Sequence, residues 1–218
     1  MCIRDSVGDE IPIRLISADA GAAFDLSEDD YSALESARLI VCTDEAAWLN
    51  SITVSRRKIH NINDAIRDDM LAVDGSVVHQ HGPQGEQSKR DGLPGVLWSP
   101  KLASAASSVL SELLVDRFPT HADSIAERER SLGSRLASLE DSVRSMEGLD
   151  ISVQNAKCRY LFAGGNDSVK ADASLPDGQI VIRGKDQMAK LVVTPVEESM
   201  IESLEETFQS IEAAILEL

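Results

Sequence analysis

The apolar pattern of residues 121–146 constrains the fold of this chain more than any other stretch. Apolar residues recur there at spacings of three, four and seven, the period of one helix face. At about 1.5 Å per residue the helix would be roughly 35 to 40 Å long, close to the diameter of a small domain. A coiled-coil arm is the alternative, but the stripe is short and occurs once, so packing on a globular body is expected. The predicted buried side consists of Ile125, Leu132, Leu136, Leu139, Val143 and Met146.

Two further helical patterns flank this stretch. Residues 101–115 predict a helix that ends before Phe118-Pro119-Thr120, because proline cannot continue a helix. Its expected inward face comprises Leu102, Ala105, Ala106, Val109, Leu110, Leu113 and Leu114. Residues 201–218 predict a last helix, whose apolar face must dock on the body or on a partner, and the body is the expected choice. This face comprises Ile201, Leu204, Phe208, Ile211, Ile215 and Leu218.

The N-terminal part alternates short strand patterns with helical ones. Residues 11–16 alternate at period two and predict a strand, and Ser27 is a suitable N-cap for a helix that follows it. Such a succession favours a parallel α/β layer. The remaining expected elements are inward-facing Tyr31, Leu34 and Ala37, strands over 38–43 and 58–62, and a short helix over 46–52.

The C-terminal part predicts a smaller α/β lobe. Strands are expected over 158–163, 179–183 and 190–194, with turns at 164–167 and 176–178. The fold class expected for the chain is therefore α/β, with two small lobes built on parallel sheets and linked by a long helix. The expected divisions are an N-terminal lobe over 7–120 that contains a histidine loop (76–92), a linking helix over 121–147, and a reduced lobe over 148–218.

Composition excludes several functional classes. The chain has 218 residues, enough for a real core, and 21 basic against 37 acidic side chains give a net charge of −16. Such a field repels phosphate backbones, so nucleic-acid binding is not expected, whereas cations are attracted. A solvated acidic surface without any ligand is the plainer interpretation of the same excess.

The cysteines and the apolar runs exclude two more classes. Three cysteines without a CxxC spacing indicate neither a disulfide framework nor a thiolate zinc site, and Cys42 in its apolar run is interpreted as a small buried residue. No apolar stretch approaches the roughly 20 residues of a membrane-spanning helix. Residues 1–6 are interpreted as a non-native leader, so the true start of the protein is expected to be missing from this sequence.

Residues 78–88 carry two of the four histidines, His79 and His81, in a loop that contains glycine and proline. Both imidazoles can reach one metal ion if the loop folds back, and tetrahedral zinc then needs further donors, for which Asp19, Asp44 or Glu86 are candidates. Two solvated loop histidines are the alternative. His60 and His121 are interpreted as packing or capping residues.

The order of these parts resembles the metal-binding solute-binding proteins of zinc and manganese ABC importers. The resemblance covers nearly all of residues 8–165 and thins afterwards, where part of the second lobe is missing before Val192-Val193-Thr194-Pro195. It rests on the acidic segment 19–24, the segment 45–58, the histidine loop, Leu97-Trp98-Ser99-Pro100 at a helix start, the long helix, and residues 154–161, which are similar to a strand-to-helix motif.

This resemblance implies a periplasmic or other extracytoplasmic metal carrier. Such a protein, expected to be a monomer, captures a divalent cation between its lobes and delivers it to an ABC permease in the membrane. Zinc or manganese would be the transported ligand, and no catalytic cofactor is implied. The implied metal residues are His79, His81, Asp19 and Asn155.

The chain departs from the family pattern at several ligand positions. Gln87 and Lys89 stand where the loop usually has two more histidines, and Asn155 replaces a histidine. Because an amide oxygen is a poorer zinc ligand than imidazole nitrogen, weakened affinity is expected. Ser99 replaces an aspartate and is expected to cap the helix. A diverged relative that binds no metal and acts as an interaction or scaffold protein is the rival hypothesis.

An enzymatic function is not expected. The chain contains no Gly-x-Ser-x-Gly elbow, P-loop or HExxH motif, and Gly164-Gly165-Asn166 is too short for a phosphate-binding fingerprint. Neighbouring carboxylates such as Asp29-Asp30 and Glu205-Glu206 point in different directions on a helix surface.

Overall fold

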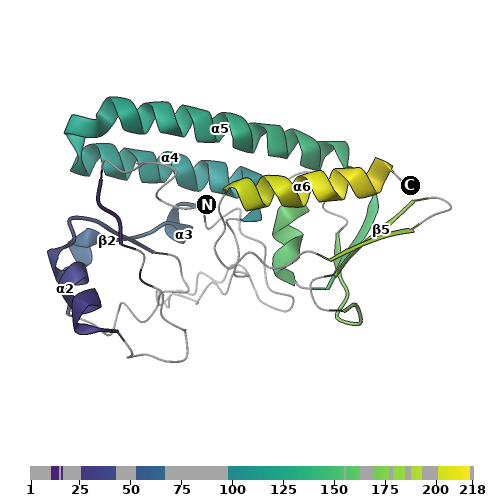
Figure 1. The fold of residues 1–218 in the computed structure, drawn as a ribbon, viewed down its shortest axis with the longest axis horizontal. Coiled ribbons are helices and arrows are strands. Elements are labelled where there is room, and N and C mark those ends of the chain that lie inside the picture. Colours follow the sequence, from purple (N-terminus) through teal and green to yellow (C-terminus); the bar gives the residue numbers. More distant parts are fainter. Residues whose placement is uncertain are drawn as a thin grey trace, which may run out of the picture. The chain divides into compact units, whose positions relative to one another are not determined.

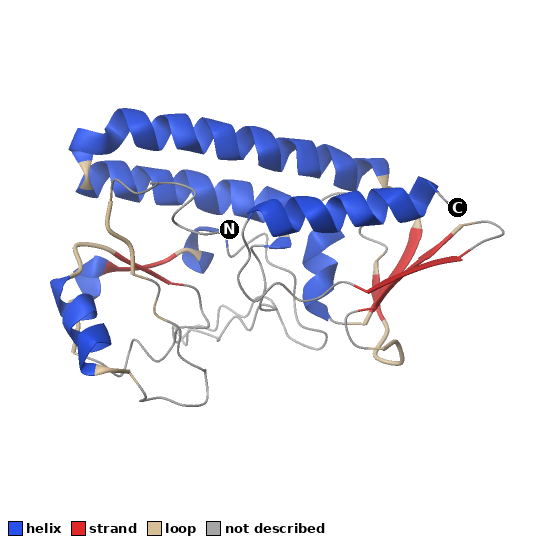
Figure 2. Cartoon of the chain, in the orientation of Figure 1, coloured by secondary structure: helices blue, strands red, loops and turns tan. Residues whose placement is uncertain are grey.

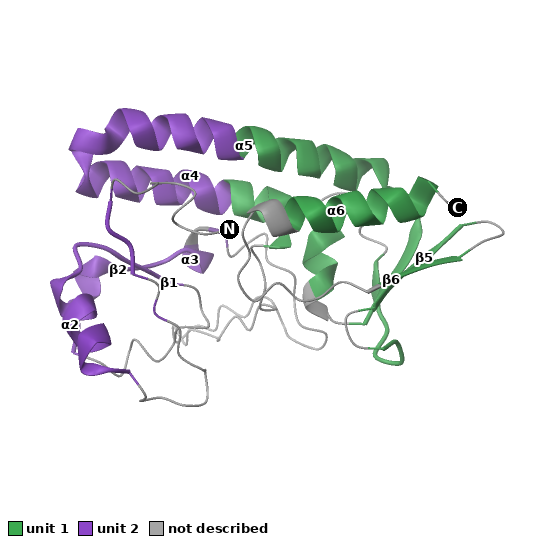
Figure 3. Cartoon of the chain, in the orientation of Figure 1, with its two compact units in different colours: residues 1–2, 67–104, 133–218 green, residues 3–66, 105–132 purple. Residues whose placement is uncertain are grey.

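The computed structural model describes residues 11–14, 16, 26–42, 53–66, 98–154, 156–162, 169–176, 179–184, 188–192 and 201–216 (Figure 1). The chain divides into two compact units (Figure 3). Unit 1 contains residues 1–2, 67–104 and 133–218, and unit 2 contains residues 3–66 and 105–132. The boundary falls inside the two longest helices, α4 (Pro100–Arg117) and α5 (Ala122–Ser145). The predicted lobes over 7–120 and 148–218 with a linking helix stay a prediction.

Unit 2 is built on a pair of short parallel strands. Strands β1 (Ile40–Cys42) and β2 (Ile59–Asn61) pair with Ile40 opposite Ile59, which confirms the predicted strands and their parallel arrangement. Figure 2 shows these strands in red among helices in blue. The other elements of the unit are α2 (Glu28–Ser36), η2 (Arg56–Lys58), α3 (Asn63–Ile66) and η5 (Pro119–His121).

A small apolar cluster lies between α2 and the strand pair. Leu34 and Ile40 are buried, and the half-buried residues packed against them are Ile16, Leu26, Ala37, Cys42, Val54 and Ile59. Tyr31 is exposed, so its predicted inward position is wrong, because α2 buries only Leu34. The strand predicted over 11–16 is also wrong for the described residues 11–14 and 16. Ile11 is buried and Ile16 half-buried without strand pairing, and Pro12 lacks a ladder donor.

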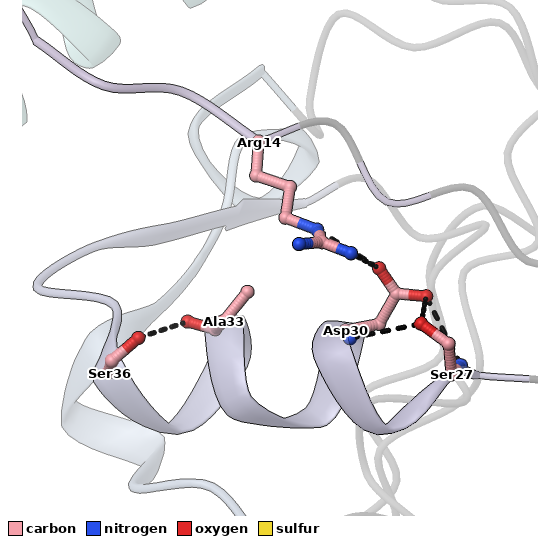
Figure 4. Close-up of polar contacts among 5 residues, drawn as sticks. All are labelled: Arg14, Ser27, Asp30, Ala33 and Ser36. Atoms are coloured by element: carbon pink, nitrogen blue, oxygen red, sulfur yellow. Dashed lines mark hydrogen bonds and ion pairs between the residues drawn. The ribbon is translucent and has the colours of Figure 1, made fainter.

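The predicted cap of α2 is confirmed. Ser27 Oγ accepts a hydrogen bond from Asp30 N at 3.2 Å, and Asp30 Oδ2 accepts one from Ser27 N at 3.2 Å (Figure 4). This reciprocal arrangement is a capping box, which satisfies two donors at the helix end. Arg14 Nη2 lies 2.6 Å from Asp30 Oδ1. The hydrogen bond from Ser27 and then the one from Arg14 lower the pKa of Asp30, so the carboxylate that caps the helix stays ionised.

Helices α4 and α5 differ in how well their buried faces follow the hydropathy pattern. All six residues of the predicted α5 stripe are buried, so that prediction is confirmed. The α4 helix is also confirmed, and its predicted inward face holds except at the exposed Ala105, with Val109 and Leu113 half-buried. Its buried residues are Leu102, Ala103, Ala106, Ser107, Leu110, Ser111 and Leu114.

Replacing the buried Ser107 by alanine is expected to stabilise the protein, whereas most substitutions of buried residues destabilise it. Ser107 Oγ is buried and has no hydrogen-bond partner within the described ranges, and such a hydroxyl costs about 1 to 3 kcal/mol. We expect Ser107→Ala to raise the free energy of unfolding by about 1 kcal/mol in urea denaturation. Ser108→Ala is the matched control, because Ser108 Oγ donates to Glu129 Oε1 at 3.0 Å on the exposed side. Both changes gain the same helix propensity, so equal effects would contradict the prediction.

Unit 1 is built on a four-stranded mixed sheet. The strands are β3 (Asp150–Val153), β4 (Lys170–Ala171), β5 (Gln179–Arg183) and β6 (Met188–Val192), in the order β4-β3-β5-β6. Strand β5 confirms its prediction, and β6 begins two residues earlier than predicted. The expected parallel sheet is wrong here, since β5 is antiparallel to both β3 and β6. Only residues 184–187 join β5 to β6, whereas a parallel pair needs a crossover of a dozen residues or more.

Two further elements complete unit 1. Residues 156–162 form η6 (Ala156–Phe162), so the strand predicted over 158–163 is wrong for the described residues 158–162. Helix α6 (Ile201–Leu216) contacts β6 and buries Leu204, Phe208 and Ile211, which confirms docking on the body. Among the described helices, none is both long and apolar enough to cross a membrane.

Candidate functional site

The residues predicted to bind metal lie outside the described residues. These are Asp19, His79, His81 and Asn155, together with the further candidates Asp44 and Glu86. The site therefore stays a prediction. The structure does describe elements that lie next to these residues in the sequence, and we call these elements anchors.

One anchor is the carboxyl-terminal edge of the β1–β2 pair in unit 2. Because the strands are parallel, both end at the same edge, at Cys42 and Asn61. Ile62 N donates to Cys42 O at 2.9 Å, and Asn61 Oδ1 accepts from Asn63 N at 3.0 Å, so both strand ends are held by hydrogen bonds. Asp44 follows this edge by two residues. Ligands of open α/β sheets bind outside the carboxyl ends of strands, which is the edge that these residues occupy.

Cys42 and His60 lie next to each other on this strand pair. The half-buried Cys42 Sγ donates a hydrogen bond to His60 O at 3.7 Å, so the thiol is packed as a small side chain and is less buried than predicted. His60 Nε2 is buried without a hydrogen-bond partner in the described part of the chain. Within that part, no three side chains of His, Cys, Asp or Glu gather as a metal cluster.

A second anchor is the start of α4, which follows the histidine loop in the sequence. Ser99 is fully buried, its carbonyl oxygen accepts from Ala103 N at 2.8 Å, and its Oγ accepts from Leu102 N at 3.3 Å. The predicted capping role of Ser99 is thereby confirmed. A buried, capped helix start fixes the backbone at the beginning of α4.

The third anchor consists of β3 and η6, the two elements that flank Asn155 in the sequence. Gln154 N donates to Gln179 O at 2.9 Å, and Val153 is fully buried. After Asn155 the chain enters η6, where Cys158 and Tyr160 are buried. This is the strand-to-helix transition that the family resemblance implied. The backbone on both sides of Asn155 is therefore held by the sheet and the core.

Asp172 is a carboxylate whose hydrogen bonds lie within a turn of unit 1. It follows β4, and its Oδ1 accepts hydrogen bonds from Ser174 N at 3.0 Å and from Ser174 Oγ at 2.5 Å. These bonds lower the pKa of Asp172, with a smaller contribution from the charge of Arg183. The carboxylate thus stabilises the turn that follows β4.

Comparison with known proteins gives a match in structure only. No family model matches the chain, and no curated protein matches its sequence. The metal-dependent lipoprotein YcdH from Bacillus subtilis has a TM-score of 0.59 at 16% identity, over 79% of this chain and 63% of YcdH. A Zn(II)-bound variant of AdcAII from Streptococcus pneumoniae has a TM-score of 0.57 at 15% identity, over 97% of this chain and 73% of AdcAII.

ZnuA gives a third match, with a TM-score of 0.55 at 13% identity over 97% of this chain and 73% of ZnuA. The chain thus has the fold of metal-binding ABC solute-binding proteins and spans less than two thirds of the length of YcdH. At such identities the similarity concerns the fold, and function has to be argued from the site.

Proposed function

We propose that this chain is a solute-binding protein of a metal-ion ABC importer. It captures a divalent cation, zinc or manganese, outside the cytoplasm and delivers it as a monomer to a permease in the membrane. The observation that carries the proposal is the fold that it shares with YcdH, AdcAII and ZnuA. The net charge of −16 supports it, because it draws cations toward the surface. The protein is a carrier and not an enzyme.

The proposed metal ligands are His79 and His81, with oxygen donors from Asp19 and Asn155. Imidazole nitrogen and carboxylate oxygen are both ordinary zinc ligands, and manganese favours the oxygens. In the sequence, His79 and His81 precede the anchor at the start of α4, and Asn155 lies between the two elements of the third anchor. Because Asn155 supplies an amide in place of an imidazole, the affinity is weaker than a site with a third histidine would give.

The proposed architecture of the carrier is a lobe over 7–120 and a reduced lobe over 148–218, joined by a helix over 121–147. The continuous helix α5 (Ala122–Ser145) supports a stiff connection. A stiff connection restrains hinge motion, so capture of the ion depends on local loop movement.

The second candidate function is a diverged relative that binds no metal and acts as a scaffold. The observation that favours it is the loss of imidazoles at Gln87, Lys89 and Asn155. The titration below decides between the two functions.

We expect chelator-stripped protein to bind zinc or manganese with one-to-one stoichiometry and micromolar affinity in calorimetry. His79→Ala combined with His81→Ala should weaken binding roughly tenfold or more. Even the loss of a residue that only forms a hydrogen bond to a metal ligand lowers metal affinity by about that factor. His121→Gln is the control, because it removes an imidazole from η5. Flat traces for both ions would exclude the carrier and favour the scaffold. An unchanged affinity in the double variant would place the ligands elsewhere.

A further inference from the structure

Basic side chains gather at the amino-terminal edge of the β1–β2 pair in unit 2. The parallel strands start at the same edge, with Ile40 opposite Ile59. Arg38 lies two residues before β1, and η2, which consists of Arg56, Arg57 and Lys58, leads directly into β2. The register therefore brings the residues that precede the two strands together at one edge.

The C-terminal end of α4 lies at the same edge. Arg38 Nη2 donates a hydrogen bond to Arg117 O at 2.7 Å, and the Arg38 guanidinium lies 4.7 Å from the centre of the Phe118 ring. A guanidinium held by a carbonyl and an aromatic face is pre-organised, so little entropy is lost when it binds. We call the group Arg38, Arg56, Arg57, Lys58 and Arg117 the basic edge.

Of the basic edge, Arg117 has a carboxylate beside it, since Arg117 Nε lies 3.6 Å from Asp116 Oδ2. Lys58 Nζ donates to the backbone oxygen of Glu35 at 2.7 Å, which leaves its charge unpaired by that contact. Arg56 and Arg57 are exposed and form no ion pair with any residue that the structure describes. The basic edge thus carries five of the 21 basic residues of a chain whose net charge is −16.

The basic edge lies where β1 and β2 begin, at the opposite end of the strand pair from Cys42 and Asn61. A group of cations repels a divalent metal ion, at a cost that grows as the charges approach. The ligand of the basic edge must therefore be an anion.

We infer that the basic edge docks an acidic protein segment. Guanidinium groups bind carboxylates through two parallel hydrogen bonds, and Arg56 and Arg57 leave such donors available. At physiological salt, charges separated by more than about 8 Å are screened, so a short acidic segment senses the basic edge more than the remaining surface. A long nucleic acid or a broad anionic membrane would meet the acidic surface as well and be repelled.

The test uses a fluorescein-labelled peptide of ten glutamates and measures anisotropy on the full chain. Chelator is present, so the outcome does not depend on metal binding. We expect Arg56→Gln with Arg57→Gln to weaken binding roughly tenfold, as the loss of two exposed ion pairs predicts. Arg128→Gln with Arg130→Gln is the control. It removes the same charge from α5 and should leave the affinity unchanged.

Three outcomes would overturn the inference. Wild-type protein that does not bind the peptide at low salt has no such docking surface. Equal weakening in both double variants would mean that peptide binding depends on the net charge of the protein and not on the basic edge. The protein could instead bind vesicles that contain phosphatidylglycerol, lose this binding in the Arg56/Arg57 variant, and not bind the peptide. That result would mean that the basic edge binds lipid. Melting temperatures of both variants should match the wild type, because the Arg56 and Arg57 side chains are exposed.

Discussion

Replacing Phe208 by alanine is expected to lower the free energy of unfolding by about 3 to 5 kcal/mol. Phe208 lies in the middle of the apolar face of α6 and is 1% exposed. Its neighbours on that face, Leu204 and Ile211, are also buried, and α6 contacts β6. The truncation leaves a cavity that these neighbours fill only in part. Because domains of this size are stable by about 5 to 15 kcal/mol, guanidinium denaturation should show a large shift.

Two further variants make the Phe208 experiment decisive. Gln209→Ala changes the exposed next residue and should alter the free energy of unfolding by less than about 0.5 kcal/mol. Phe208→Leu keeps an apolar side chain in the site and should cost less than the alanine variant. A loss below about 1 kcal/mol for Phe208→Ala would mean that α6 is not packed on unit 1 as the structure describes.

The elements that the sequence predicted well are long and have one strongly apolar face. The α5 stripe repeats over many turns, so each buried residue supports the same period. The same signal predicts the α4 helix and most of its buried face, but it includes the exposed Ala105 and misses three small buried residues. Ala103, Ser107 and Ser111 are buried there, and small side chains contribute little hydropathy. Helix existence is therefore easier to predict than helix orientation.

Short strands were harder to predict, because pairing decides them more than local pattern does. Strand β4 has two residues and is defined only by its ladder with β3. Four of residues 158–162 are apolar and buried, with Arg159 the exception, and such a run suits a buried strand and a buried helical turn equally. The family resemblance, which implied a strand-to-helix transition there, was the better guide.

The candidate site was predictable where it depends on backbone chemistry. Ser99 caps α4 as its residue type suggested, because a serine oxygen readily accepts from a helix N–H group. The proposed metal ligands His79 and His81 lie in a segment outside the described residues, so their geometry is a matter for the titration. The basic edge was not predicted. The sequence does contain the run Arg56-Arg57-Lys58. Only the parallel register of β1 and β2 shows that Arg38 lies at the same edge as this run.

The ion pair between α5 and α6 predicts how stability depends on pH. Arg135 Nε and Nη2 each donate to a different oxygen of Glu205 at 2.7 Å. This bidentate hydrogen bonding lowers the pKa of Glu205 and outweighs the opposite effect of burial. A carboxyl group whose pKa is lower in the folded state stabilises the fold above its unfolded pKa. That stabilisation is lost as the pH falls below about 4.3 and through the folded pKa.

Arg135→Gln should therefore cost about 1 to 2 kcal/mol at pH 7, since the side chains of Arg135 and Glu205 are 36% and 28% exposed and solvent weakens the pair. The difference from wild type should shrink steadily in denaturation experiments as the pH is lowered through the acid range. Arg144→Gln is the control, because the Arg144 side chain is 60% exposed and its pairs with Glu140 and Asp141 lie within one helix. A cost for Arg135→Gln that persists at acid pH would show that Arg135 stabilises α6 by packing, because protonated Glu205 can no longer form the ion pair.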